Sequence, residues 1–283
     1  MTILFRTLTF VCLSLFSSAL LSNESSVVKP DIIRGEWVQG ALIEGRLPKG
    51  YSLEVLGRKV LLRADGSFVF GLGRDTSASL NVIVKNTAGV EKQFTYGVKQ
   101  REYPTQRIEG VAKKYVAPPP EVSKRISEEN RRVKQARKKV RPVIEFAEGF
   151  TWPLIGPITG VYGSQRVFNG VPKRPHYGLD IAGPVGAVVV APAPGEVTLA
   201  HNDMYYSGGT LIVDHGYGVS STFIHLSEIL VSEGQKIARG QPIAKVGASG
   251  RVTGPHLDWR INWFSERLDP KLLLPPMPNP GGE

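Results

Sequence analysis

The sequence predicts a mostly β protein, with a small N-terminal β domain, one linker helix and a larger C-terminal β-rich domain. Glycine (31 residues) and proline (21 residues) are abundant, which favours turns. Short runs rich in Val and Ile recur between turn residues, as they do in all-β domains. Only residues 121–140 show a convincing helical pattern. The length of 283 residues allows one or two domains with a sizeable core.

Residues 1–22 have the pattern of a signal peptide. Arg6 provides a positive charge, residues 8–16 are apolar, and Ser17, Ser18 and Ala19 supply the small residues that follow. The apolar run is short and polar residues follow it at once. We therefore expect an exported protein with no stable transmembrane span after processing. An uncleaved N-terminal anchor is the alternative.

Composition restricts the chemistry of the mature chain. The single cysteine, Cys12, lies in the apolar run, so neither a disulfide scaffold nor a thiol nucleophile remains after cleavage. The net charge of +10 becomes +9 once Arg6 is removed. For an exported protein this charge favours an anionic polymer, such as cell wall or lipid head groups, over nucleic acid.

Residues 23–100 read as the small N-terminal β domain. Short apolar runs alternate with turns such as Asp65-Gly66, and this spacing predicts a sandwich or a barrel. The runs lie at residues 41–43, 52–56, 59–63, 67–70, 80–84 and 93–96. The segment contains no histidine, so we expect a packing or binding module and no catalytic site.

Residues 101–150 read as a linker that carries a basic helix. Pro104 and the prolines at residues 118–120 favour an extended chain. In residues 121–140, Ser123 or Ser127 is a candidate cap, and the late basic residues suit the helix dipole. Apolar positions are sparse, so we expect a largely solvated helix. Its charged face is either an ordinary surface or a binding site for an anionic polymer.

Residues 151–274 form the second β-rich segment, and residues 275–283 read as a flexible tail. Strands are predicted at residues 188–190, 195–199, 210–213 and 221–224. All five histidines lie in this segment, at positions 176, 201, 215, 225 and 256. We therefore expect any catalytic or metal-binding site to lie in this segment.

A histidine and an aspartate four residues apart open the segment, in the run His176-Tyr-Gly-Leu-Asp180. Around Gly178 a tight extended turn lets the imidazole and the carboxylate converge on one cation. Zn²⁺ accepts nitrogen and oxygen ligands of this kind, and a catalytic zinc site keeps three protein ligands and a water. The run suggests a metal-centred hydrolase, and the histidines that follow it in the sequence test this interpretation.

Six motifs then follow in the order of a known family. They are His176-Tyr-Gly-Leu-Asp180-Ile-Ala, Pro192-Ala-Pro-Gly195-Glu-Val, Asp214-His-Gly216, Phe223-Ile-His225-Leu, Gly234-Gln-Lys-Ile-Ala-Arg-Gly240-Gln and Gly247-Ala-Ser-Gly250-Arg-Val-Thr-Gly-Pro-His256-Leu. In these motifs residues 151–274 resemble the zinc metallopeptidases typified by lysostaphin and LytM, the M23-type peptidoglycan endopeptidases. The resemblance implies a β-sandwich-like peptidase domain in the periplasm or cell envelope of a bacterium.

The resemblance also implies a set of site residues. His176 and Asp180 match two zinc ligands, and His225 and His256 match catalytic histidines. The family ends on His-x-His, whose second histidine is the third zinc ligand, and here that position is Asp258. Because residues i and i+2 of a strand face the same side, we expect Asp258 to project toward the metal. Asp oxygens do bind Zn²⁺, but two carboxylates predict a weaker or less zinc-selective site with a less acidic bound water.

The function that the resemblance implies is zinc-dependent hydrolysis of amide bonds in the peptide stems or cross-links of peptidoglycan. The alternative is a non-catalytic relative that binds and activates other cell-wall hydrolases. The altered Asp258 favours this alternative, and the retained motif residues oppose it. Residues 231–244 also resemble the hairpin of lipoyl and biotinyl carrier domains, but no lysine stands at the attachment point.

Other residues of the segment also receive predictions. Tyr205, Tyr206 and Arg251 are candidates for lining a substrate groove. We expect structural roles for the remaining residues of the motifs and for their aromatic neighbours. These residues are His215, Trp259, Trp263 and Asp269.

Overall fold

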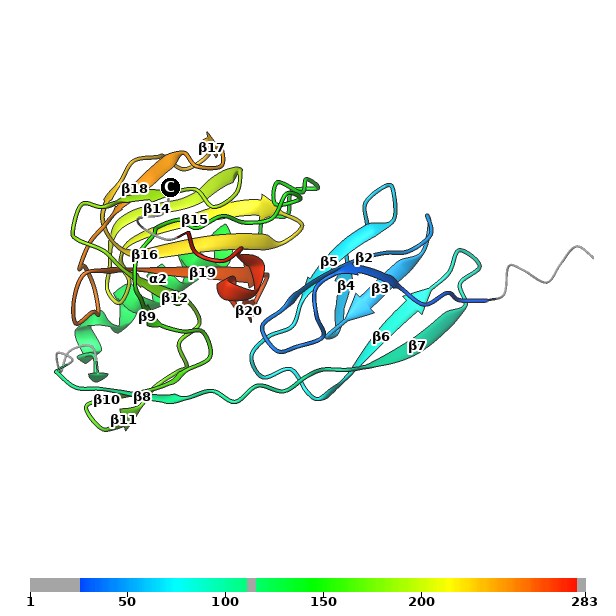
Figure 1. The fold of residues 1–283 in the computed structure, drawn as a ribbon, viewed down its shortest axis with the longest axis horizontal. Helices are drawn as coiled ribbons and strands as arrows, with labels where there is room; N and C mark the ends of the chain where they lie inside the picture. Colours follow the sequence, from blue (N-terminus) through cyan, green and yellow to red (C-terminus); the bar gives the residue numbers. More distant parts are fainter. Residues whose placement is uncertain (1–25, 111–115, 279–283) are drawn as a thin grey trace, which may run out of the picture.

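The computed structural model describes residues 26–110 and 116–278. Figure 1 shows two β-rich lobes along the long axis, with helix α2 beside the C-terminal lobe. The predicted signal peptide at residues 1–22 lies outside the described residues. Across the two described ranges, no helix is both long and apolar enough to cross a membrane.

The N-terminal lobe contains two antiparallel sheets, with strand orders β1-β2-β5 and β4-β3-β6-β7. The strands are β1 (Asp31–Arg34), β2 (Leu42–Arg46), β3 (Ser52–Val55), β4 (Arg58–Val60), β5 (Ser67–Gly71), β6 (Ser79–Lys85) and β7 (Glu91–Gly97). The six predicted apolar runs all fall on strands, and β1 is an additional one. The two sheets share one buried core, which makes the lobe a sandwich and not a barrel.

The C-terminal lobe is built on a ten-stranded sheet with the main order β17-β14-β15-β16-β19-β12-β9, while β18 joins β13 to β16 and β20 pairs with β19. Its strands are β9 (Ile158–Gly160), β12 (Leu179–Ala182), β13 (Val188–Val190), β14 (Gly195–Met204), β15 (Gly208–Gly216), β16 (Val219–Ile229), β17 (Lys236–Ile237), β18 (Pro242–Val246), β19 (His256–Trp263) and β20 (Glu266–Leu268). The short helix η2 (Pro270–Leu273) follows. The four predicted strands are present, and three of them are longer than predicted.

The central strands β15 and β16 form the buried middle of this sheet. Every residue of β15 is buried, and so are the first eight of β16. The apolar side chains of these strands pack with β19, where Trp259 and Trp263 are almost fully buried. The predicted packing role of both tryptophans is confirmed. A rigid, fully paired sheet therefore carries the motif residues of β16 and β19.

The predicted linker contributes a strand to the C-terminal lobe. β8 (Thr105–Ile108) pairs in parallel with β10 (Gln165–Phe168), which also pairs with β11 (Val171–Pro172). The register places Gln106 opposite Arg166 and Ile108 opposite Phe168. Residues about 60 positions apart along the chain thus lie side by side, in the lower left part of Figure 1.

Helix α2 (Ser123–Ala136) follows the 3₁₀ turn η1 (Pro120–Val122). The expected serine cap is wrong, because the N-cap residue is Val122 and no side chain caps the helix. The turn that starts at Pro120 already uses the backbone N–H of Ser123, so the helix continues from this turn. The outer face is solvated as expected, while Val133 and Ala136 pack on β14 and β15.

The two lobes are joined by packing and by one buried ion pair. Phe70 meets Trp263 edge to face at a centroid distance of 6.5 Å. Asp269 is buried, accepts a hydrogen bond from Arg101 Nη1 at 2.8 Å, and donates its backbone N–H to the carbonyl of Gly40. The structural role predicted for Asp269 is therefore confirmed, and it consists of holding the N-terminal lobe and the linker.

Candidate metal centre

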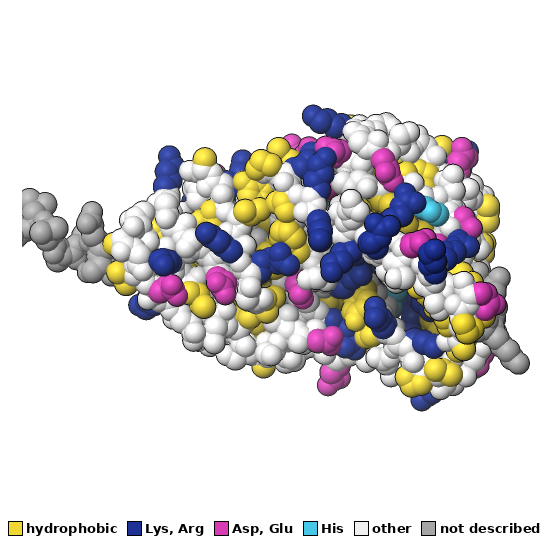
Figure 2. Space-filling view, turned by 180° about the vertical axis from the view of Figure 1, so that it is seen from behind, with side chains coloured by type: hydrophobic (Ala, Val, Ile, Leu, Met, Phe, Trp, Pro, Cys, Tyr) yellow, Lys and Arg dark blue, Asp and Glu magenta, His cyan; other side chains and the backbone are white. Residues whose placement is uncertain are grey.

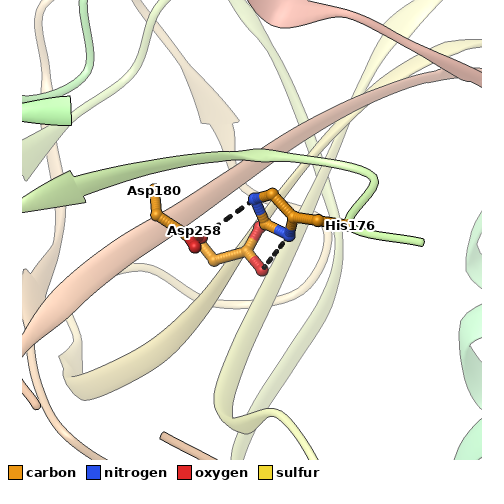
Figure 3. Close-up of side chains that lie close together, drawn as sticks. All are labelled: His176, Asp180 and Asp258. Carbon is orange, nitrogen blue, oxygen red and sulfur yellow. Dashed lines mark ion pairs between the residues drawn. The ribbon is translucent and has the colours of Figure 1, made fainter. Parts of the chain in front are cut away.

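His176 lies just before β12 and is held by its backbone. Its N–H donates to the carbonyl of Ser164 at 2.8 Å, and its own carbonyl accepts from the N–H of Gly163 at 2.7 Å. These bonds orient the imidazole toward Asp180 on β12, with 3.1 Å between His176 Nε2 and Asp180 Oδ1. Figure 3 shows the carboxylates of Asp180 and Asp258 on the same side of the ring, with a dashed line from each ring nitrogen to one of them. The predicted convergence of His176 and Asp180 is present.

Asp258 faces Asp180 from the neighbouring strand. The two are directly opposed in the β12–β19 register, and Asp258 Oδ2 is 3.9 Å from His176 Nδ1. The two carboxylates thus face different nitrogens of the same imidazole. Like charges directly opposite on a sheet destabilise it unless other groups compensate them. This site therefore requires cations.

Two arginines provide the compensation. Arg260 makes a bidentate interaction with Asp258, in which Nε donates to Oδ1 at 2.9 Å and Nη2 donates to Oδ2 at 2.5 Å. Arg166 Nη2 donates to Asp180 Oδ2 at 2.6 Å. Burial opposes ionisation of Asp258, but the Arg260 charge holds the pKa of this carboxyl well below its usual range. Asp180 likewise has a lowered pKa, because His176 and Arg166 outweigh burial and the charge of Asp258.

Two glycines make room for the carboxylates. A Cβ at Gly178 would come 2.2 Å from Asp258 Oδ1, and one at Gly160 would come equally close to Asp180 Oδ2. Both are shorter than any tolerable contact with a carboxylate held on a strand. Gly178 is therefore required for the packing of Asp258 and Arg260, beyond the turn that the sequence predicts around it.

The donor set has the character of a cation site. Ligand atoms of His176, Asp180 and Asp258 lie within 4.8 Å of one another, and all three residues are buried. Both ring nitrogens of His176 and Oδ1 of Asp180 are buried and have no hydrogen-bond partner. Native proteins rarely leave such atoms unsatisfied without a functional reason. The residue types therefore fit a divalent metal ion, while Arg260 competes for the oxygens of Asp258.

His225 and His256 lie next to these ligands, with ring centroids 5.0 Å apart. His225 Nδ1 bonds the carbonyl of Ser249 at 2.8 Å, and His256 Nδ1 bonds the carbonyl of Gly254 at 2.9 Å. A carbonyl only accepts, so each Nδ1 carries the proton and each Nε2 is left as an acceptor. His256 Nε2 is 3.8 Å from Asp180 Oδ1.

His225 has an unusual backbone conformation. Its φ is +68°, in the left-handed region that residues other than glycine rarely adopt. Regular alternation along β16 would point it to the same side as Phe223, away from Asp258. The left-handed residue interrupts this alternation, and such strain is typical of functional sites. Burial also lowers the pKa of His225 to about 4, so the ring is neutral at pH 7.

A cleft of about 200 Å³ opens over these side chains. The walls include Asp180, His225 and His256, together with Arg251 from the loop before β19 and Gln106 from β8. Arg251 lies over Tyr206, 4.8 Å from its ring centroid. Arg251 thus lines the cleft as predicted. Figure 2 shows the face opposite to that of Figure 1, where Lys and Arg side chains gather around a hollow in the C-terminal lobe.

His215 differs from the motif histidines in its contacts. It is completely buried, its Nδ1 bonds the carbonyl of Pro194 at 2.6 Å, and its Nε2 bonds Ser221 Oγ at 2.8 Å. Both ring nitrogens are therefore satisfied inside the protein. The structural role that the sequence predicts for His215 is confirmed.

The structure brings together all five predicted site residues and adds two that the sequence analysis missed. His176, Asp180 and Asp258 place ligand atoms within 4.8 Å of one another, and His225 and His256 line the cleft together with Asp180. Arg166 and Arg260 are the additions. Alternation along β19 would have placed Arg260 on the same side as Asp258. No local signal connects Arg166 with Asp180.

Comparison with known proteins identifies the class. Residues 174–270 match the sequence profile of Peptidase family M23, so this part of the chain is a domain of that family. A crystal structure assigned to peptidase M23 from Pseudomonas aeruginosa superposes with a TM-score of 0.66 and 28% identity, over 84% of this chain and 95% of the other. The similarity to this structure thus extends well beyond the matched domain.

Two relatives illustrate the range of the family. Peptidoglycan DD-endopeptidase ShyA of Vibrio cholerae is 42% identical over 98 residues, which are 34% of this chain and 23% of ShyA. Murein hydrolase activator NlpD of Escherichia coli is 30% identical over 124 residues, 44% of this chain and 31% of NlpD. The chain therefore matches less than a third of the length of either relative. One is named for hydrolysis and the other for activation.

Proposed function

We propose that the protein is an exported, metal-dependent endopeptidase that hydrolyses amide bonds in the peptides of peptidoglycan. One observation carries the proposal: His225 and His256, each with Nε2 left as an acceptor, line the same cleft as Asp180, whose Oδ1 is buried without a hydrogen bond. The similarity to ShyA supports this proposal. A protein that only binds a partner has no need for two oriented histidines in a strained, buried cleft.

His176, Asp180 and Asp258 would hold the metal, and Zn²⁺ is the ion that the family resemblance implies. Such a metal would supply Lewis acidity, which polarises a carbonyl and lowers the pKa of water. His225 is neutral, and its Nε2 accepts the proton of the attacking water while Ser249 fixes the opposite nitrogen. His256 lies at the more open side of the cleft, and it donates from Nε2 to the oxyanion once protonated.

Asp258 is the residue that we expect to limit metal binding, and with it the activity. Its two oxygens already accept the fork of Arg260, so the third ligand is shared between a metal and a guanidinium. A neutral imidazole at this position would attract no arginine and would be free for the metal. We therefore expect weaker zinc binding than a site with two histidines and one carboxylate provides.

A second candidate function rests on the same ion pair. If Arg260 stays paired with Asp258, this arginine and Arg166 neutralise the carboxylates of Asp258 and Asp180 without any metal. The domain would then bind peptidoglycan or another cell-wall hydrolase without cutting. The similarity to NlpD supports this candidate.

Digestion of purified peptidoglycan separates the two candidates. Wild type, His176→Ala, Asp258→Ala and the control His201→Ala are incubated with zinc, and the released fragments are identified by mass. We expect wild type and the control to release the same peptides, and the other two variants to lose at least a hundredfold in rate. Identical fragments from all four proteins would refute the site. No fragments from any protein, combined with stimulation of a separate hydrolase, would establish the second candidate.

A further inference from the structure

A cluster of hydrogen-bond donors lies on the sheet beyond Arg260, outside the candidate metal centre. It consists of Arg137, Ser220, Thr222, Asn262 and Arg267, and we refer to it as the donor cluster. Ser220 opposes Asn262, and Thr222 opposes Arg260, in the β16–β19 register. Asn262 also opposes Arg267 of β20. Residues two apart on a strand share a face, so the donor cluster continues the row formed by Asp258 and Arg260.

The two arginines of the donor cluster have few partners. Arg137 Nη2 donates to Thr222 Oγ1 at 2.8 Å, and Arg267 Nη1 donates to Asn262 Oδ1 at 3.2 Å. Within the part of the chain that the structure describes, no carboxylate oxygen lies within 4.0 Å of either guanidinium. The carboxylate of Asp258 is taken by Arg260. Neither guanidinium therefore forms a close ion pair with a described residue.

Three buried polar groups of the donor cluster are also unsatisfied. They are Nε of Arg137, Oγ of Ser220 and Nδ2 of Asn262, none of which has a hydrogen-bond partner. Ser220 is 4% exposed and Asn262 is fully buried. All three groups are able to donate, and a buried donor without an acceptor costs about 1–3 kcal/mol. The cluster therefore lacks acceptors.

The balance of charge around the donor cluster also indicates that negatively charged partners are lacking. Among Arg137, Arg260 and Arg267, only Arg260 forms a close ion pair with a described carboxylate, and the carboxyl end of α2 next to Arg137 adds only about half a negative charge. Burial and the neighbouring arginines lower the pKa of Arg137 well below its usual range, and they lower that of Arg267 to about 10. A buried excess of positive charge is stabilised by an anion.

We propose that the donor cluster binds a carboxylate of the ligand that occupies the cleft. The guanidinium fork matches the plane of a carboxylate, and the hydroxyl and amide donors would complete its hydrogen bonds. Asn262 is four residues from Asp258 on β19, which corresponds to about 13 Å along the strand. Taken with the proposed function, on which this part rests, an extended peptide would carry its free carboxylate about four residues from the cleaved bond.

Binding of an acid and its amide tests the proposal without any hydrolysis. The full chain is titrated calorimetrically, in a chelator, with an acetylated tetrapeptide that ends in a free carboxylate and with the same peptide ending in an amide. We expect the acid to bind wild type at least tenfold more tightly, and Arg137→Gln to remove this preference. Arg132→Gln is the matched control, because this arginine lies on the same helix, is more exposed, and pairs with Glu233. The control should keep the preference.

Asn262→Asp provides a second test that does not depend on a peptide. This variant introduces a tethered carboxylate beside Arg267, within the donor cluster, with almost no change of volume. We expect its melting temperature to rise and its preference for the acid peptide to disappear. A lower melting temperature, equal binding of acid and amide to wild type, or a retained preference in Arg137→Gln would overturn the proposal. Because no metal is present, these results are independent of whether the domain cuts peptidoglycan.

Discussion

Two buried polar clusters on the same sheet, built from the same residue types, differ in one respect. In the first, Arg141 Nε meets Asp214 Oδ2 at 2.6 Å, and the adjacent His215 has both ring nitrogens bonded. In the second, His176 makes no side-chain hydrogen bond, although it is as buried as His215 and lies 3.1 Å from Asp180. We call them the closed cluster and the open cluster.

The difference separates a structural role from a functional one. The closed cluster satisfies its polar atoms from within the chain, so it contributes to stability and offers nothing to a ligand. The open cluster keeps unsatisfied atoms in a cleft, which costs stability in the absence of a ligand and provides binding energy for one. Residue identity alone does not distinguish the two clusters, since each contains histidine, aspartate and arginine.

The largest expected effect concerns the closed cluster. Arg141→Met leaves Asp214 buried without its cation and should lower the free energy of unfolding by about 3–5 kcal/mol. His176→Asn leaves Asp180 its ion pair with Arg166 and should therefore cost only about 1 kcal/mol. Urea denaturation of both variants measures the difference. Equal losses would show that the two clusters contribute equally to the free energy of unfolding, and would contradict their assignment to different roles.

Acid should weaken the closed cluster through His215. Burial lowers the pKa of His215 to about 4, below the usual value of about 6.5, so the unfolded chain takes up the proton first. The stabilisation is therefore complete above pH 6.5 and is lost as pH falls toward 4, by at most about 1.4 kcal/mol per pH unit. His215→Gln should reduce the pH slope of the unfolding free energy across this window. An unchanged slope would contradict the assigned burial.

The open cluster should gain zinc affinity when its third ligand becomes neutral. Asp258→His frees the position from Arg260, whose side chain is 24% exposed. With zinc at a hundred times the dissociation constant of the variant, the protein should be stabilised by about 2.7 kcal/mol. Thermal unfolding with and without zinc measures this gain, and wild type at the same zinc concentration should gain less. A larger gain in wild type would show that Arg260 does not compete.

The smallest change concerns the space around Asp258. Gly178→Ala places a methyl group against Asp258 and Arg260 and should destabilise the protein by about 1–3 kcal/mol, because the carboxylate and its arginine have to shift. Gly254→Ala is the control, since no atom lies within 4 Å of its added Cβ. Chemical denaturation compares the two. If both alanines are tolerated equally, the ion pair is looser than its distances indicate.

Much of the fold is readable from the sequence because its signals are local. β6 alternates buried and exposed residues as its apolar pattern predicts, and the turns around it contain glycine. β1 escaped prediction because it is a four-residue edge strand without a buried residue. The helix cap was mispredicted because a proline-initiated turn replaced the expected serine. The missed features have no periodicity to detect.

The candidate site also contains residues that the sequence predicted and residues that it did not. Motif order predicted His176, Asp180, His225 and His256, and strand alternation placed Asp258 among them. What the sequence could not reveal is how the charge of Asp180 is compensated. Its partner Arg166 lies on β10 in a separate sheet, so this pair depends on how the two sheets are placed. Arg260, the partner of Asp258, is two residues further along β19 and follows from strand alternation. The donor cluster depends on the register of β16, β19 and β20.

The parallel pairing of β8 with β10 has a mechanical consequence. β8 is part of the segment that connects the lobes, and its Gln106 and Ile108 form one wall of the cleft. The tether of the N-terminal lobe is thus also a component of the cleft. A fragment cut at the boundary of the matched family domain, at residue 174, would lose this wall and Arg166 with it. The smallest unit that preserves the cleft begins before Thr105.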